Sequence, residues 1–584
     1  MKKFTGIPAS SGIAIGKAFL YLEEDFPEIP RYAIKKNQVD SEWGRLLRVI
    51  GEASEEIKAL HGRAVREMSK EQADIFEAHL LMLEDVEFQN QIKERLEADL
   101  QNIEWIVWDI SHKLTLKLMS SPDPVFRERA VDISDVSRRI LDKLLSITRF
   151  SLADLNHDVI LVVHDLLPSN VLNMNKARVK GLVMDMGSRT SHTAILARAF
   201  NIPAVLGLSN ITGEIKDGDR LVVNGGTGEV IVKPDRPALV QNESAISEFH
   251  KMKAELLALG DMPAETQDGR RVILKANIEI PEEADQVVRH GAEGIGLYRS
   301  EFLFLTPGTA AEEDAQYRAY SYVLKTLGNL PVTIRTMDVG GDKLLPDLQA
   351  TDEKNPLLGW RAIRFSLANP ELFKTQLRAI LRASVDGNVR IMFPMIAGIE
   401  ELEEALALLE EARMECRRQG CSLAEQIEVG TMIEVPSAAM TADILAERSD
   451  FFSIGTNDLV QYTLAADRGN ERVSYLGQPN HPAVLRLLKM TIDAAHRRGI
   501  QAAMCGELAG DPSVTPLLLG LGLDEFSMTA SSIPLVKRII RGVSMEHCRA
   551  LAEQALGCTS CHQVNSLMAD WMAGHFPSGL DYGI

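Results

Sequence analysis

A single histidine lies in a run of small and polar residues within the stretch MDMGSRTSHTAILARAF (184–200). Ser188, Thr190 and Ser191 lie just before His192, and an apolar run typical of a helix follows it. Thr190 or Ser191 is a natural N-cap, and the free backbone amides of a first helical turn favour an anion. An imidazole at such a place is a candidate for phosphorylation. The alternative is an ordinary helical histidine that satisfies a carbonyl group.

Arginines recur at predicted strand ends, or in the loops just after them, in the second half of the chain. Arginine forks bind phosphate and carboxylate groups bidentately, so several arginines around one site favour a small polyanion. Each one could instead pair with a surface carboxylate. The segment VGGDK (339–343) could add backbone amides and the charge of Lys343. The arginines are Arg299, Arg335, Arg361 and Arg468.

Two carboxylates and a thiol follow other predicted strands of the same region. Glu434 in MIEVP and Asp458 in GTNDL are oxygen ligands of the kind that Mg²⁺ prefers when a phosphate completes its shell. Asp458 could instead cap the helix that follows it. Cys505 in MCGELAGD could donate or remove a proton, or could simply be a small buried hydrophobe.

These side chains can form one site only in a fold that brings the ends of the strands together, and the second half of the chain predicts such a fold. β-rich segments alternate with helical stretches, which favours a parallel sheet closed into a (β/α)₈ barrel with its active site at the C-terminal strand ends. Further polar residues, among them Asn277, Glu301, Asp338, Asn457 and Glu507, fall at those ends. The predicted strands are 271–278, 294–302, 332–338, 389–396, 428–436, 450–458, 501–508 and 524–530.

The first half predicts an α/β domain with a helical block inserted into it. Apolar residues at three- and four-residue spacing predict helices from about residue 40 to 147. Residues 5–22 predict a short strand and turns, and residues 236–262 a connecting helix. Strand signals fall at 158–165, 179–187 and 202–208, with a hairpin at 219–234.

Composition narrows the class of protein. The formal net charge of −19 argues against nucleic acid and permits a basic protein partner. No apolar run is long enough to cross a bilayer, and the N-terminus lacks the unbroken apolar core of a signal peptide, so we expect a cytoplasmic protein. Cys558, Cys561 and His562 match the haem-attachment spacing, for which a chance match or a reactive thiol pair is the alternative.

Taken together, these motifs resemble Enzyme I of the bacterial phosphoenolpyruvate-dependent sugar phosphotransferase system. The resemblance runs in order from GIPASSGIAIGKA through ADIFEAHLLMLED, GSRTSHTAILAR, GAEGIGLYRSEFLF, RTMDVGGDK, NPLLGWRAIR and RIMFPMI to FFSIGTNDLVQYTLAADRGN and MCGELAGD. It implies a swivelling phosphohistidine α/β domain (1–38 and 148–235), a helical subdomain (39–147), a linker helix (236–262) and a C-terminal (β/α)₈ TIM barrel (263–584).

The resemblance also implies a reaction and its residues. The barrel would bind phosphoenolpyruvate (PEP) and Mg²⁺, and His192 would take the phosphoryl group on Nε2 and pass it to the phosphocarrier protein HPr, docked on the helical subdomain. Cys505 would protonate the enolate, and the barrel would form a homodimer. Glu434 and Asp458 would bind Mg²⁺. The residues implied for PEP are Arg299, Arg335, Asn457, Asp458 and Arg468, to which the residue chemistry adds Lys343 and Arg361.

The chain departs from the family pattern at Ser188, where glycine is usual, and at Leu167, where threonine is usual and is expected to support the histidine. The segment after Leu556 follows no family pattern. The alternatives are a PEP synthase or pyruvate phosphate dikinase, for which no ATP-binding domain is visible before the histidine, a nitrogen-type paralogue feeding a regulatory cascade, and an inactive scaffold that only binds HPr.

Overall fold

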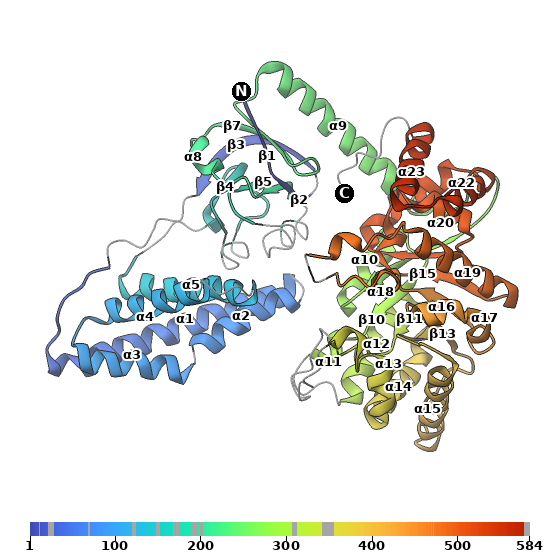
Figure 1. Ribbon diagram of the computed structural model, residues 1–584. Coiled ribbons are helices and arrows are strands. Elements are labelled where there is room, and N and C mark those ends of the chain that lie inside the picture. Colours follow the sequence, from blue (N-terminus) through green and yellow to red (C-terminus); the bar gives the residue numbers. More distant parts are fainter. Residues whose placement is uncertain are drawn as a thin grey trace. The chain divides into compact units, whose positions relative to one another are not determined.

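The computed structural model describes most of the chain in two compact units, unit 1 within Met1–Lys251 and unit 2 within Met252–Leu580 (Figure 1). The described residues are 1–10, 12–21, 29–67, 70–83, 85–119, 124–147, 152–166, 170, 174–187, 197, 202–305, 312–340, 355–468, 470 and 472–576.

Unit 1 contains an eight-stranded sheet in the order β1-β8-β7-β3-β4-β5-β6-β2. Its centre is parallel, and β4 reads VILVV, a fully buried aliphatic run of the kind that suits a strand covered on both faces. The β7–β8 pair is the predicted antiparallel hairpin. The strands are β1 (Lys2–Thr5), β2 (Ile7–Ser10), β3 (Ile13–Tyr21), β4 (Val159–Val163), β5 (Val179–Met184), β6 (Ala204–Leu206), β7 (Arg220–Asn224) and β8 (Glu229–Val232).

The prediction of one short strand and turns for residues 5–22 was wrong. The whole of β2 and β3 lies within that range, and so does the last residue of β1. Their partners are distant in sequence: β2 pairs with β6, and β3 with β4 and β7. Pro8 lies in β2, an edge strand, where proline is tolerated. Long-range pairing therefore overrides the local glycine and proline signals.

The predicted helical block is confirmed as five helices around their own apolar core. Asp85 caps α3 by accepting from the backbone N–H of Glu87 at 2.8 Å. His79 is buried, with Nε2 3.3 Å from Asp132 Oδ1, so it has a structural place between α2 and α5. The helices are α1 (Val39–Glu67), α2 (Lys70–Leu83), α3 (Val86–Asp99), α4 (Ile103–Met119) and α5 (Pro124–Leu144).

Unit 2 is the predicted barrel. Each of the eight predicted segments contains one strand, and the strands form a closed, all-parallel barrel in the order β9 to β16. The fold class predicted from the sequence is therefore confirmed for this unit. The strands are β9 (Ile273–Ile278), β10 (Ile295–Arg299), β11 (Val332–Arg335), β12 (Val389–Phe393), β13 (Glu428–Ile433), β14 (Phe451–Ile454), β15 (Gln501–Met504) and β16 (Glu525–Met528).

The barrel interior carries an apolar cluster and a charged cluster. Leu297, Met392, Met432, Phe451 and Cys505 pack together on its inward faces. The charged cluster joins Lys275 to Glu525 (Nζ–Oε2 2.6 Å), and Arg390 of β12 approaches Glu525 of β16 at 3.6 Å. Because β12 and β16 lie on opposite sides of the barrel, this last contact crosses its interior.

Helices surround the barrel. Connecting helix α9 (Arg236–Ala258) begins at the predicted residue. Helix α19 begins at Pro482, and Gly499, with φ 72°, follows its last residue as the C-cap. The other helices are α10 (Ala284–Arg289), α11 (Phe302–Leu305), α12 (Glu313–Leu327), α13 (Ile363–Ala368), α14 (Pro370–Ala383), α15 (Ile399–Arg418), α16 (Pro436–Met440), α17 (Ala442–Leu445), α18 (Thr456–Leu464), α19 (Pro482–Arg498), α20 (Thr515–Leu521), α21 (Ile533–Gly542), α22 (Met545–Gly557) and α23 (Cys561–His575), and α8 (Ile211–Glu214) belongs to unit 1.

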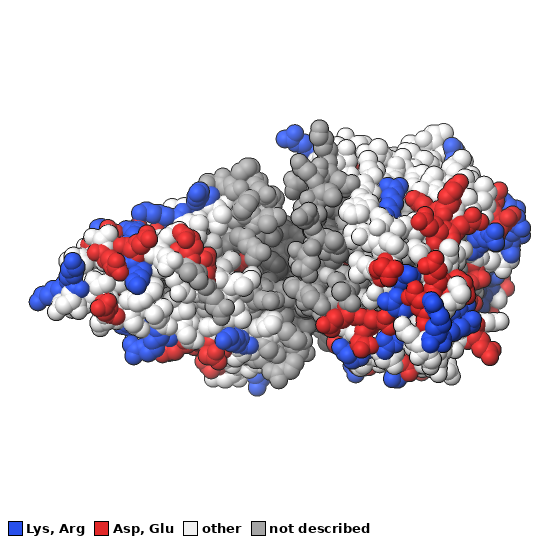
Figure 2. Space-filling view, turned by 90° about the horizontal axis from the view of Figure 1, so that it is seen from below, with Lys and Arg blue, Asp and Glu red and all other residues white. Residues whose placement is uncertain are grey.

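The face drawn in Figure 2 is mixed in charge: acidic and basic side chains intermingle among its described residues. Within the described ranges, no helix has both the length and the apolar character needed to cross a membrane. Cys558 and Cys561, where α22 ends and α23 begins, are free thiols.

Candidate active site at the barrel mouth

The structure places the predicted polar residues at the C-terminal ends of the strands. Arg299 and Arg335 are the last residues of β10 and β11, Glu434 and Cys505 directly follow β13 and β15, and Asp458 lies in the first turn of α18. Parallel strands of a closed barrel all end at the same side, so these residues share one mouth.

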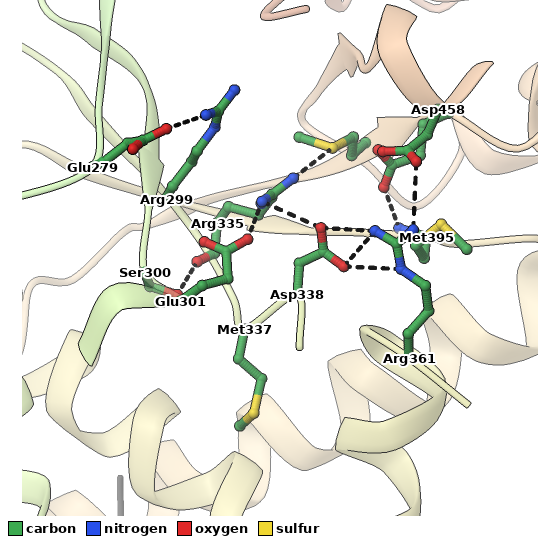
Figure 3. Close-up of polar contacts among 12 residues, drawn as sticks. Glu279, Arg299, Ser300, Glu301, Arg335, Met337, Asp338, Arg361, Met395 and Asp458 are labelled. Atoms are coloured by element: carbon green, nitrogen blue, oxygen red, sulfur yellow. Dashed lines mark hydrogen bonds and ion pairs between the residues drawn. The ribbon is translucent and has the colours of Figure 1, made fainter. Parts of the chain in front are cut away.

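Arg335 is buried between carboxylates. It forms an ion pair with Glu301, its Nη2 lies 3.3 Å from Asp338 Oδ2, and its Nη1 donates to Met432 Sδ at 3.7 Å (Figure 3). Burial lowers the pKa of the Arg335 guanidinium, but the charges of Glu301, Asp338 and Glu434 outweigh it and raise that pKa. The side chain is therefore a fixed cation inside the mouth.

Arg361 is a second buried cation, and it shares Asp338 with Arg335 (Figure 3). Its Nη2 donates to both Asp338 oxygens at 2.9 and 3.0 Å, while its Nη1 lies 3.4 Å from Asp458 Oδ1. Nη1 also donates to the Tyr462 hydroxyl at 3.2 Å. Burial raises the pKa of Tyr462 to about 12, so that hydroxyl stays neutral. Asp338 thus holds the two guanidinium groups side by side.

Glu434 is a buried acid among other acids. Its Oε1 accepts from the Met395 backbone N–H at 2.7 Å. Burial, followed by the charges of Asp458 and Asp338, raises the pKa of Glu434 to about 8, although Arg335 opposes the shift. Such an arrangement favours a cation close to Glu434 and Asp458.

A divalent metal ion fits this pair of carboxylates. Among the described residues, no group of three or more His, Cys, Asp or Glu side chains is arranged to hold a metal ion. Glu434 and Asp458 would supply two carboxylates, and Mg²⁺ commonly takes one or two carboxylates and completes its shell with water and substrate phosphate.

Cys505 has the environment of a proton donor. It is 2% exposed, and burial raises the pKa of its thiol to about 11, against the opposing effects of Ser453 and Arg335. The thiol is therefore protonated at neutral pH. Asn277 Nδ2 donates to the Cys505 carbonyl at 3.0 Å and holds the backbone in place.

The remaining predicted residues are less enclosed. Asn457 and Glu507 hold each other, with Asn457 Nδ2 3.0 Å from Glu507 Oε1. Arg299 is partly exposed and pairs with Glu279, and Arg468 is exposed. His192, Lys343, Leu167 and Ser188 lie outside the described residues.

Unit 1 anchors the strand that leads toward His192. Asp185, the residue after β5, is buried and accepts from Thr212 Oγ1 at 2.5 Å and from the Thr212 backbone N–H at 3.1 Å. Asp185 Oδ2 also lies 2.9 Å from His164 Nδ1. The end of β5 is thus fixed by three contacts before the chain continues to the histidine segment.

Some participants in the mouth were missed or undervalued in the sequence. Asp338 was noted only as a polar strand end, although it bridges Arg335 and Arg361. Nothing in the sequence around Tyr462, which lies in α18, indicated that its hydroxyl contacts Arg361. The Met395 backbone N–H, which holds Glu434, is a group that every non-proline residue carries, so no sequence pattern marks it.

Three family models match the chain. They are the PEP-utilising enzyme, N-terminal, over residues 5–129, the PEP-utilising enzyme, mobile domain, over 155–228, and the PEP-utilising enzyme, PEP-binding domain, over 253–545. The last match covers the barrel strands and every strand-end residue described above.

Proteins named phosphoenolpyruvate-protein phosphotransferase are similar over almost the full length. That of Staphylococcus carnosus (strain TM300) is 43% identical and covers 98% of this chain and 99% of its own. That of Geobacillus stearothermophilus is 44% identical, with 97% and 98% covered. An NMR solution structure of Enzyme I is 37% identical over 42% of this chain and 99% of its own, with a TM-score of 0.37. The chain therefore belongs to the PEP-utilising enzymes, and among them to the phosphoenolpyruvate-protein phosphotransferase family.

Proposed function

We propose that the chain transfers the phosphoryl group of PEP to its own His192 and from there to the histidine of HPr, as the first step of a sugar phosphotransferase cascade. The observation that carries this proposal is the pair of buried guanidinium groups, Arg335 and Arg361, fixed by Asp338 beside the acid pair Glu434 and Asp458. A site for a small phosphorylated acid needs this combination of fixed cations and metal-binding carboxylates.

The arginines act by position and charge. Phosphoryl transfer gives the protein little covalent chemistry to perform, so fixed cations that need no rearrangement supply most of the stabilisation. Arg335 and Arg361 are already held by carboxylates, and Arg299, Arg468 and Asn457 add groups that can turn toward PEP from more exposed positions. Lys343 joins them in this proposal.

Glu434 and Asp458 would hold Mg²⁺, which supplies positive charge to the phosphate oxygens of PEP. The raised pKa of Glu434 supports this role, because the site favours added positive charge. The Met395 backbone N–H holds one oxygen of Glu434 in place.

His192 and Cys505 would divide the bond changes. His192 Nε2 attacks phosphorus, the bond from phosphorus to the enol oxygen breaks, and enolpyruvate leaves. Its methylene carbon takes the proton of the Cys505 thiol to give pyruvate, and the thiolate regains a proton from water. A thiol with a pKa of about 11 holds its proton at neutral pH, as a proton donor must.

The parts of the chain would share these tasks. Residues 1–38 and 148–235 carry the histidine, 39–147 dock HPr, and 236–262 link this half to the rest. The barrel, within 263–584, binds PEP and forms the homodimer. We propose a cytoplasmic location, where PEP is made and used.

Intact-protein mass after incubation with PEP and Mg²⁺ tests the proposal. The wild-type chain should gain one acid-labile phosphoryl group without ATP, and His192→Ala should gain none. HPr added to the purified phosphoprotein should then remove the group. A wild-type chain that stays unmodified, or a His192→Ala variant that gains the group equally, would refute the catalytic role; Leu167→Thr is the first reversion to make in that case.

A further inference from the structure

A buried amide outside the barrel wall reaches the strand end that carries Arg335. Gln376 lies on α14 and is fully buried. Its Oε1 accepts from the Met337 backbone N–H at 2.9 Å. Its Nε2 donates to the Ser300 hydroxyl at 2.9 Å and to the Tyr320 hydroxyl at 3.1 Å. Both Nε2 hydrogens and the carbonyl oxygen of Gln376 are therefore used.

Ser300 closes the network onto Arg335 itself. The Ser300 hydroxyl donates to the Arg335 backbone carbonyl at 2.7 Å (Figure 3). Ser300 also directly precedes Glu301, the ion-pair partner of the Arg335 side chain. The network thus holds the Arg335 carbonyl, the Met337 amide and the turn that presents Glu301.

We infer that Gln376 is a positioning residue for PEP, acting through Arg335. This inference rests on the proposed function. The network fixes the backbone on both sides of the Arg335–Met337 segment, and Asp338, which holds Arg361, comes next along the chain. A guanidinium group binds a phosphate well only when its fork is aimed correctly, and small displacements weaken both binding and transfer.

Gln376→Met keeps the length of the side chain and removes all of its hydrogen bonds. The buried Met337 N–H then loses its acceptor, and the Ser300 and Tyr320 hydroxyls lose a donor. The strand end is expected to shift to regain partners, because unsatisfied buried groups are costly. We expect the KM for PEP to rise about tenfold, the size of one lost buried hydrogen bond.

A double-mutant cycle on the full chain separates positioning from general support of the fold. The second-order rate constant for phosphorylation of His192 by PEP is measured by intact mass for wild type, Gln376→Met, Arg335→Lys and the double variant. Gln376→Met should slow wild type about tenfold but slow Arg335→Lys less than about twofold, because coupled residues are not additive. Equal slowing in both backgrounds would overturn the inference.

Two further variants distinguish an effect on the KM for PEP from a general loss of stability. Ile380 lies on the same helix and is fully buried, and Ile380→Val removes one methylene group and no hydrogen-bonding group, so it should lower thermal stability and leave the KM within about twofold of wild type. Ser300→Ala removes the bond to the Arg335 carbonyl with a smaller change of volume and should raise the KM about threefold. A KM that follows thermal stability across all variants would overturn the inference.

The two proposals fail differently. A wild-type chain that is not phosphorylated by PEP would overturn the proposed function and the role of Gln376 with it. Normal phosphorylation of wild type, with Gln376→Met and Ser300→Ala at wild-type KM, would overturn the role of Gln376 alone.

Discussion

Replacing Arg361 by methionine should destabilise the barrel strongly. The Arg361 side chain is 3% exposed and neutralises Asp338 through three hydrogen bonds, with Asp458 at 3.4 Å. In the variant, Asp338 and Asp458 stay buried with less positive charge beside them, which costs about 3–5 kcal/mol in the free energy of unfolding. Unit 2 spans residues 252–580, so its unfolding entropy is about 0.7 kcal/mol per kelvin. The expected fall in the Tm of unit 2 is about 6 °C.

Differential scanning calorimetry at pH 7, without PEP or metal ions, measures this fall. Arg364→Met is the matched control, because Arg364 is partly exposed and its ion pair with Glu401 is 3.7 Å long, and it should lower the Tm by less than about 2 °C. Arg361→Met combined with Asp338→Asn should recover much of the loss, since the stranded charge is removed. A fall in Tm after Arg361→Met no larger than that of the control would show that the loss of Arg361 leaves no costly buried charge.

Three further outcomes follow from the same physics. Burial, followed by the charges of Asp458 and Asp338, raises the pKa of Glu434 from 4.5 to about 8, so the contribution of this group to stability is full below pH 4.5 and is lost as the pH rises through 8. Glu434→Gln should therefore raise the free energy of unfolding at pH 7 by about 3 kcal/mol, a rise of about 4 °C in the calorimetric Tm of unit 2, while abolishing phosphorylation; an unchanged Tm would contradict this. Alkylation of Cys505, followed by peptide mass, should accelerate about tenfold per pH unit up to about pH 11, and a plateau below pH 9.5 would show that burial does not raise its pKa. Lys275→Met should cost about 3–5 kcal/mol in calorimetry, whereas Lys275→Met with Glu525→Leu should cost less, because Arg390 keeps its ion pair with Glu428; equal losses would argue against a stranded charge.

The barrel could be predicted because each strand carries its own local signal. Runs such as VTIR and VRIMF are bounded by proline or polar residues and separated by helical periodicity. The predicted segments nevertheless extend past the strands: 428–436 was predicted, and β13 ends at Ile433. The extra residues include Glu434, because side chains that face the mouth follow the last backbone pairing.

The first strands of unit 1 could not be predicted in the same way. β3 pairs with β4 and β7, which lie more than a hundred residues later in the chain. Glycine and proline near these strands are turn signals locally, and only the distant partners decide that the segment is extended. Local pattern therefore predicted one short strand and turns where the sheet has the end of β1 and all of β2 and β3.

The residue types at the barrel mouth could be predicted from the sequence, but the contacts between them could not. Arginines and carboxylates at strand ends predicted a phosphate and metal site. That Asp338, three residues after Arg335, also binds Arg361, and that Gln376 of α14 supports the backbone of Met337, depends on contacts between residues more than twenty positions apart. Such partners follow from the fold, which no local spacing encodes.

The most direct test of the account is the stoichiometry of a single transfer. The full chain is mixed with less than one equivalent of PEP in the presence of Mg²⁺, pyruvate is quantified, and peptide mass spectrometry at neutral or higher pH locates the phosphoryl group. The account predicts one phosphoryl group on His192 for each pyruvate formed. Pyruvate without phosphorylated His192, or a phosphoryl group on another residue, would contradict it.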